Sequence, residues 1–79
     1  MKENNIKISY DKESEVFSVE MKKAKSIDSD ILGNVVIDYD KKGKVVRVNF
    51  YNFDFSAFKE NLEVIKNFAR KFRAPLLVR

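Results

Sequence analysis

Hydrophobic and polar positions alternate in four segments between residues 6 and 53, and this period of two predicts β-strands with one buried face. A polar run at residues 11–14 separates the first two segments and favours a hairpin turn. Asp40-Lys41-Lys42-Gly43 separates the last two, with glycine at the left-handed position of a three-residue loop. The positions predicted to face inward are Ile6, Ile8, Tyr10, Phe17, Val19, Met21, Val35, Ile37, Tyr39, Val46, Val48 and Phe50.

Two segments lack this alternation. Residues 1–5 are polar and predict a flexible N-terminal arm. Residues 22–33 are predominantly polar, with only Ile27, Ile31 and Leu32 as large apolar side chains, and predict a long connection between the two hairpins.

An amphipathic helix is predicted over residues 55–73, where apolar residues recur with the helical period. Asp54 or Ser56 can cap its first turn, and Asn61 is the polar exception on its apolar side. Pro75 ends it, and the extended tail, residues 74–79, either adds a strand or closes over the core. The apolar arc contains Ala57, Phe58, Leu62, Val64, Ile65, Phe68, Ala69 and Phe72.

Together these elements predict an α+β fold in two layers, with the order β-β-β-β-α. A four-stranded antiparallel sheet of two hairpins, residues 6–53, is covered on one face by the C-terminal helix, because a sheet with one apolar face needs a cover. A length of 79 residues fits one domain.

Composition excludes most enzyme classes. The chain has no cysteine, histidine or tryptophan, so disulfides, thiolate and imidazole chemistry and the usual zinc ligands other than carboxylates are absent. Its longest apolar runs, at residues 35–37 and 76–78, are far too short for a membrane span or a signal peptide, so we expect a cytoplasmic protein. We expect no catalytic residue, no metal site and no cofactor.

Asp38 and Asp40 are the acidic pair that comes nearest to a metal or catalytic site. Residues 38–43 begin like a calcium loop, but Lys42 occupies a ligand position and Asn49 replaces the bidentate carboxylate. The two acids share a strand face about 7 Å apart, but nearby lysines keep both ionised, which disfavours a proton donor. We therefore interpret them as solvated carboxylates of a hairpin.

The positive charge is concentrated at the C-terminus. Residues 1–54 hold ten basic and ten acidic side chains, whereas residues 55–79 hold six basic and two acidic ones, which accounts for the net charge of +4. Lys66, Arg70 and Arg73 form a stripe at helical spacing. This stripe either binds phosphates of a nucleic acid or complements the dipole at the helix C-terminus.

The outer face of the sheet offers a second candidate surface. Val36, Val45 and Tyr51 are apolar or aromatic positions there, and Arg47 lies among them. Such a mixed surface favours self-association, so we predict a homodimer that buries these four residues.

The two hairpins also resemble a known family. Residues 7–17, KISYDKESEVF, and residues 35–46, VVIDYDKKGKVV, resemble the hairpin motifs of the prokaryotic domain of unknown function 2283. The resemblance covers residues 6–53 and excludes the C-terminal helix; Arg47 departs from it, since members commonly have glycine there. It implies little about activity, although members encoded beside small toxins suggest an antitoxin-like role.

We therefore expect a small non-catalytic protein-interaction domain that self-associates and binds a protein partner encoded nearby. The alternative is a nucleic-acid-binding or antitoxin-like protein that uses the basic C-terminal helix. Salt separates the two, because phosphate contacts weaken steeply as salt rises.

Overall fold

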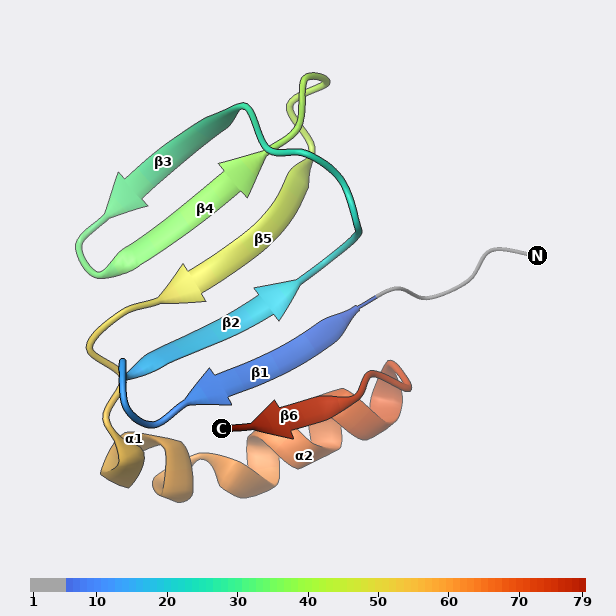
Figure 1. The fold of residues 1–79 in the computed structure, drawn as a ribbon. Helices are drawn as coiled ribbons and strands as arrows, with labels where there is room; N and C mark the ends of the chain where they lie inside the picture. The colour runs from blue at the N-terminus through green and yellow to red at the C-terminus, as the bar shows by residue number, and fades with distance from the viewer. Residues whose placement is uncertain (1–5) are drawn as a thin grey trace.

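Six strands form one mixed sheet in the computed structural model, which describes residues 6–79 (Figure 1). Across the sheet the order is β3-β4-β5-β2-β1-β6, and every neighbouring pair is antiparallel except β1 with β6, which is parallel. The arm predicted at residues 1–5 lies outside the described residues. The strands are β1 (Lys7–Asp11), β2 (Val16–Glu20), β3 (Asp28–Leu32), β4 (Val35–Tyr39), β5 (Val45–Phe50) and β6 (Leu76–Val78).

The α+β class is confirmed, but the predicted four-stranded antiparallel sheet is wrong, because two further strands form. β3 lies in the segment predicted as a connection and pairs with β4 along all five of its residues. Its run Asp28-Ser29-Asp30 disfavours a strand by intrinsic propensity. Gly33, at a φ of 64°, and Asn34 make the two-residue loop that joins Leu32 to Val35.

β6 is the second addition, and it realises one of the two alternatives for the C-terminal tail. Leu76 lies opposite Ile8 of β1. The Ile8 N–H donates to the Pro75 carbonyl at 3.0 Å, and the Arg79 N–H donates to the Tyr10 carbonyl at 2.8 Å. The helical segment after β5 carries the chain back along the sheet, so β6 runs parallel to β1.

Two helices, α1 (Phe55–Glu60) and α2 (Leu62–Lys71), replace the single helix predicted over residues 55–73. Asp54 is the N-cap, and its Oδ1 accepts from the Ala57 N–H at 2.8 Å. Asn61 separates the helices, and its Nδ2 donates to the Ala57 carbonyl at 2.8 Å. A short polar side chain that bonds the backbone in this way competes with regular helix, which explains the interruption.

The core lies between these helices and one half of the sheet. Partly buried residues of β2, β5 and β6, among them Val19, Phe50 and Leu76, pack around it, and no residue of β3 or β4 belongs to it within residues 6–79. Figure 1 shows both helices beside β1 and β6, with β3 and β4 standing clear of them. The buried members are Ile8, Tyr10, Phe17, Phe58, Ile65 and Ala69.

Candidate functional site

A polar network crosses the face of the sheet opposite the core. The Oδ1 atom of Asp38 accepts from Ser29 Oγ at 2.7 Å, and its Oδ2 accepts from Arg47 at 3.1 Å and from Asn49 Nδ2 at 3.3 Å. Ser18 Oγ donates to Asn49 Oδ1 at 2.8 Å. Asp38 and Asn49 are each 8% exposed. Side chains of four adjacent strands thus satisfy one another's hydrogen-bonding groups. Asp38 therefore has a structural role at the centre of this network.

Of the four residues predicted for self-association, Arg47 belongs to this network, and Val36, Val45 and Tyr51 lie on or next to the strands that carry it. Arg47 belongs to it through the ion pair with Asp38, and Val36 lies opposite Asn49 in the strand register. Val45 begins β5, with 37% of its surface exposed. Tyr51 follows β5, is 43% exposed, and its N–H donates to the Asn34 carbonyl at 2.8 Å. The outer face is therefore more polar at its centre than the sequence pattern indicates.

The predicted basic stripe is shorter in the structure. Lys66 and Arg70 are exposed on α2, and Arg70 donates to the side-chain oxygen of Asn67. Arg73, the third residue of the predicted stripe, lies outside the helix, because α2 ends at Lys71 and Arg73 adopts a left-handed φ of 52°. Nucleic-acid binding through this helix remains a prediction that rests on two cations rather than three.

The helix-side face of the sheet carries apolar residues beyond the core. Val19 and Phe50 pack against the core, and residues directly opposite each other across antiparallel strands share a face. Val48 pairs with Val19, and Val35 pairs with Phe50. Ile37 and Leu32 continue these two rows onto β4 and β3. We call Leu32, Val35, Ile37 and Val48 the apolar apron.

The apron ends at an exposed sheet edge. All five residues of β3 are exposed, and Leu32 is 63% accessible. Its neighbour Ile31 is 73% accessible and projects to the opposite, outer face, where it pairs with Val36. The polar run at residues 28–30 obscures this edge in the sequence, although Gly33-Asn34 between apolar residues is a hairpin signal.

Part of the predicted apolar arc of the helix is also exposed. Val64 is 68% accessible, and Phe68 and Phe72 are 36% and 37% accessible. The Phe68 and Phe72 rings pack together with centroids 4.7 Å apart. The apolar arc therefore includes residues that the core does not bury, because the helices cover only one half of the sheet.

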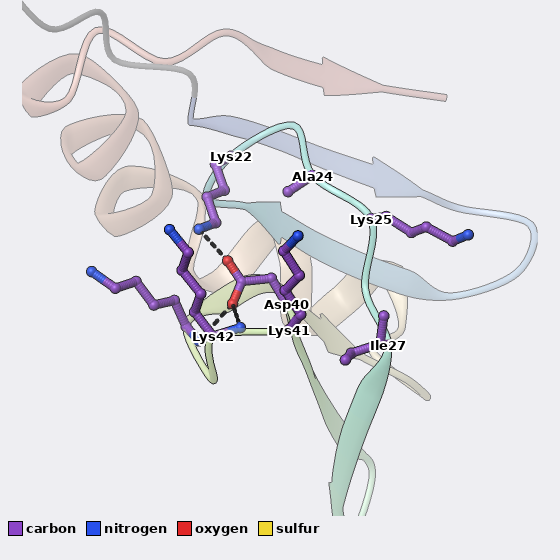
Figure 2. A pocket seen from close by; sticks show the side chains of 8 residues that line it. Lys22, Ala24, Lys25, Ile27, Asp40, Lys41 and Lys42 are labelled. Carbon is purple, nitrogen blue, oxygen red and sulfur yellow. Dashed lines mark hydrogen bonds and ion pairs between the residues drawn. The ribbon is translucent and has the colours of Figure 1, made fainter.

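A lysine-rich pocket of about 500 Å³ lies between the segment that follows β2 and the turn that joins β4 to β5 (Figure 2). At its centre the Oδ2 atom of Asp40 accepts from Lys22 Nζ at 2.5 Å, and Oδ1 accepts from the Lys42 and Lys44 N–H groups at 2.9 Å each. The pocket is lined by Lys22, Ala24, Lys25, Ile27, Asp40, Lys41, Lys42 and Lys44.

These contacts set the charge of Asp40. The hydrogen bond from Lys22, followed by the backbone hydrogen bonds from Lys44 and Lys42 and the charge of Lys22, lowers the pKa of Asp40 to about 2. Asp40 is thus ionised at neutral pH and engaged with both sides of the pocket. The sequence alone does not bring the lysines at residues 22–25 together with those at residues 41–44, because their proximity depends on the pairing of β2 with β5.

Other site classes find no support within the described chain. No group of three or more His, Cys, Asp or Glu side chains in residues 6–79 is placed to hold a metal ion. In the same range no helix has both the length and the apolar character to span a membrane.

The comparisons with known proteins give one match. No curated protein and no solved structure matches the chain. Residues 7–53, which run from β1 to just beyond β5, match the family described as Protein of unknown function (DUF2283). The resemblance of the two hairpins is confirmed, and the chain belongs to the DUF2283 family.

Proposed function

We propose that the protein is a small non-catalytic interaction domain that self-associates through the apolar apron. The observation that carries this proposal is the mismatch between sheet and helices. The helix-covered core stops before β4, while the apolar face continues across β4 to Leu32, which is 63% exposed. Apolar patches that remain accessible beside a core are typical of protein-association sites.

A second copy of the chain fits this surface for reasons of symmetry. Two sheets pack face to face when their apolar side chains interdigitate about 10 Å apart. A two-fold axis lets each copy supply the same four side chains, so one contact covers both aprons. It would also add buried area to a small domain, whose own core buries a limited fraction of its surface.

The rim of the apron is polar, as interface rims usually are. Asp30 is exposed and pairs with Ile37, which places it on the apron face. Its Oδ2 accepts from the Tyr39 hydroxyl at 3.1 Å. This hydrogen bond, more than desolvation, raises the pKa of Tyr39. Asp30 and Tyr39 thus bound the apolar surface along one side.

The outer face is the competing surface for self-association. Covering it would take the exposed part of Arg47, the partner of the buried Asp38, out of water, and that desolvation opposes the Coulombic gain. The apron carries no charged side chain among its four residues, and Asp30 lies at its rim, so covering the apron desolvates less charge. This difference favours the apron over the surface around Val36, Val45, Arg47 and Tyr51.

Adjacent residues of β3 give a matched test, because Leu32 and Ile31 are both exposed but project to opposite faces. Molar mass by light scattering, from low micromolar to several hundred micromolar chain, should show a dimer for the wild type and for Ile31→Glu. Leu32→Glu should remain a monomer, because it buries a carboxylate in the apron contact. A wild-type mass that stays monomeric at every concentration would refute self-association. Dissociation by Ile31→Glu alone would move the interface to the outer face.

A further inference from the structure

The lysine-rich pocket carries positive charge that the protein does not neutralise. Five lysines and one aspartate line it, and the aspartate, Asp40, pairs with Lys22. For Lys25, Lys41, Lys42 and Lys44, the part of the chain that the structure describes provides no ion pair. Like charges that line one pocket repel one another, and a bound anion relieves that repulsion.

The backbone under these lysines is fixed at several points. The Met21 N–H donates to the Val46 carbonyl at 2.7 Å, and the Ile27 N–H donates to the Tyr39 carbonyl at 2.9 Å, so both ends of the 22–27 segment are anchored. The Asp40 N–H donates to the Lys44 carbonyl at 2.9 Å, which closes the turn. The lysine side chains are long, but their origins are preorganised around one space, which lowers the entropic cost of binding.

The composition of the pocket favours an anion held by point charges. It contains no arginine, whose planar fork binds carboxylates and phosphates in a bidentate manner. Lysine ammonium groups act as point charges and are frequent phosphate ligands. Figure 2 shows Lys22 directed at the Asp40 carboxylate, between the strand end and the turn that carries Lys41 and Lys42. Ala24 and Ile27 add apolar contact area to the wall.

We propose that the pocket between the 22–27 segment and the 40–44 turn binds a ligand with several phosphate groups, supplied either by a nucleic-acid strand or by a free polyphosphate. A volume of about 500 Å³ lies within the range of small-molecule sites. Asp40 is a positioning residue in this site, because it holds Lys22 and the turn while leaving the other four lysines to the ligand.

A second pocket, of about 290 Å³ on the outer face, is less suited to this role. Its cations include Arg47, which is already paired with Asp38, and Glu20 lies among them. The net positive charge available there is smaller, so the lysine-rich pocket is the stronger phosphate site.

Two triple variants of the full chain test the proposal with equal changes in charge. The pocket variant is Lys41→Gln/Lys42→Gln/Lys44→Gln, and the control is Lys66→Gln/Arg70→Gln/Lys71→Gln on α2. Each removes three positive charges, which takes the net charge from +4 to +1. Fluorescence anisotropy follows a labelled single-stranded oligonucleotide over a range of salt concentrations, and thermal unfolding confirms that both variants fold.

We expect the pocket variant to bind the oligonucleotide at least about tenfold more weakly at low salt, with a log–log salt slope smaller by about 2. The control should change affinity by less than about threefold, because its charges lie elsewhere. Displacement by inorganic tripolyphosphate at similar phosphate concentration would assign the site to free polyphosphate, and resistance to it would assign the site to the strand. Either result supports phosphate binding.

Three results would overturn the proposal. The first is a wild type that fails to bind both the oligonucleotide and tripolyphosphate at low salt. The second is a loss of oligonucleotide affinity in the control as large as that in the pocket variant. Such a loss would show that binding depends on the overall net charge or on the basic residues of α2. The third is equal displacement by poly-glutamate of matched charge, since a phosphate site should prefer phosphate.

Discussion

The rings of Tyr10 and Phe58 stack with their centroids 4.4 Å apart and their planes 5° from parallel. This contact joins β1, inside the sheet, to α1. Tyr10 is fully buried, and its hydroxyl donates to the Phe53 carbonyl at 2.7 Å. Burial is the main cause that raises the pKa of Tyr10. The short first helix therefore supplies the central aromatic contact between helices and sheet.

Truncating two phenylalanines of the same helical arc should have unequal effects. Phe58 is 3% exposed and Phe68 is 36% exposed. Phe58→Ala should lower the free energy of unfolding by ~3 to 5 kcal/mol, which is the usual cost of emptying a core phenylalanine site. Phe68→Ala should cost only about 1 to 2 kcal/mol, since part of its ring already contacts water. Urea titration measures both, and equal losses would show that α2 covers the sheet as fully as α1.

Local pattern was enough to predict the hairpins but not the extent of the sheet. The alternation around Ile8, Phe17 and Val48 predicts strands, because successive residues of a strand point to opposite faces and the pattern is therefore visible over a few neighbouring positions. β3 is not predicted, because the low strand propensity of Asp28 and Asp30 exceeds the contribution of Ile31 and Leu32. Pairing with β4 makes this segment a strand.

The candidate surfaces depend on how strands and helices are arranged in space, and a single sequence gives little information about that arrangement. Helical periodicity placed Phe68 in the apolar arc but could not show that the helices lie over only half of the sheet. The two lysine clusters lie at the end of β2 and at the turn before β5, and they meet because these strands are neighbours. No local rule predicts that neighbourhood.

Gly43 should be required for its backbone conformation alone. Its φ is 78°, and a Cβ built there has no heavy atom within 4 Å, so a substitution meets strain but no clash. Gly43→Val should cost about 1 to 2 kcal/mol, because a β-branched residue is disfavoured at positive φ. Gly43→Asn should cost less, since asparagine visits that region more readily. Chemical denaturation ranks the two, and identical losses would show that the turn relaxes out of the left-handed conformation.

Removing the Asp38 side chain should lower the free energy of unfolding more than removing any single donor that it binds. Asp38→Ala leaves Arg47, Asn49 and Ser29 without this acceptor, and Asn49 is buried. We expect a loss of about 2 kcal/mol, moderated because the Arg47 side chain is 35% exposed. Ser29→Ala removes one hydrogen bond and should cost roughly 1 kcal/mol. Equal effects of the two variants in thermal unfolding would show that the network does not act as a unit.

The Lys22–Asp40 pair should make stability depend on acidic pH. The pKa of Asp40 is lowered to about 2 in the folded protein, whereas an unfolded aspartate titrates near about 4. A lowered folded pKa means that the stabilisation is present above the unfolded value and is lost as pH falls through the folded one. Wild type should therefore exceed Asp40→Asn in thermal midpoint by a constant margin from neutral pH to about pH 5, and the margin should shrink between about pH 4 and pH 2.

Lys22→Met supplies the control for this pH dependence, because it removes the largest cause of the lowered pKa of Asp40. In that background the acid-dependent margin between Asp and Asn at position 40 should be smaller, with the backbone hydrogen bonds from Lys42 and Lys44 accounting for what is left. The wild-type margin persisting unchanged at pH 2 would indicate that Asp40 stabilises the turn by shape rather than by charge. A margin that vanishes at pH 2 in the wild type and is already reduced in Lys22→Met would show that the charge of Asp40 ties the two sides of the lysine-rich pocket together.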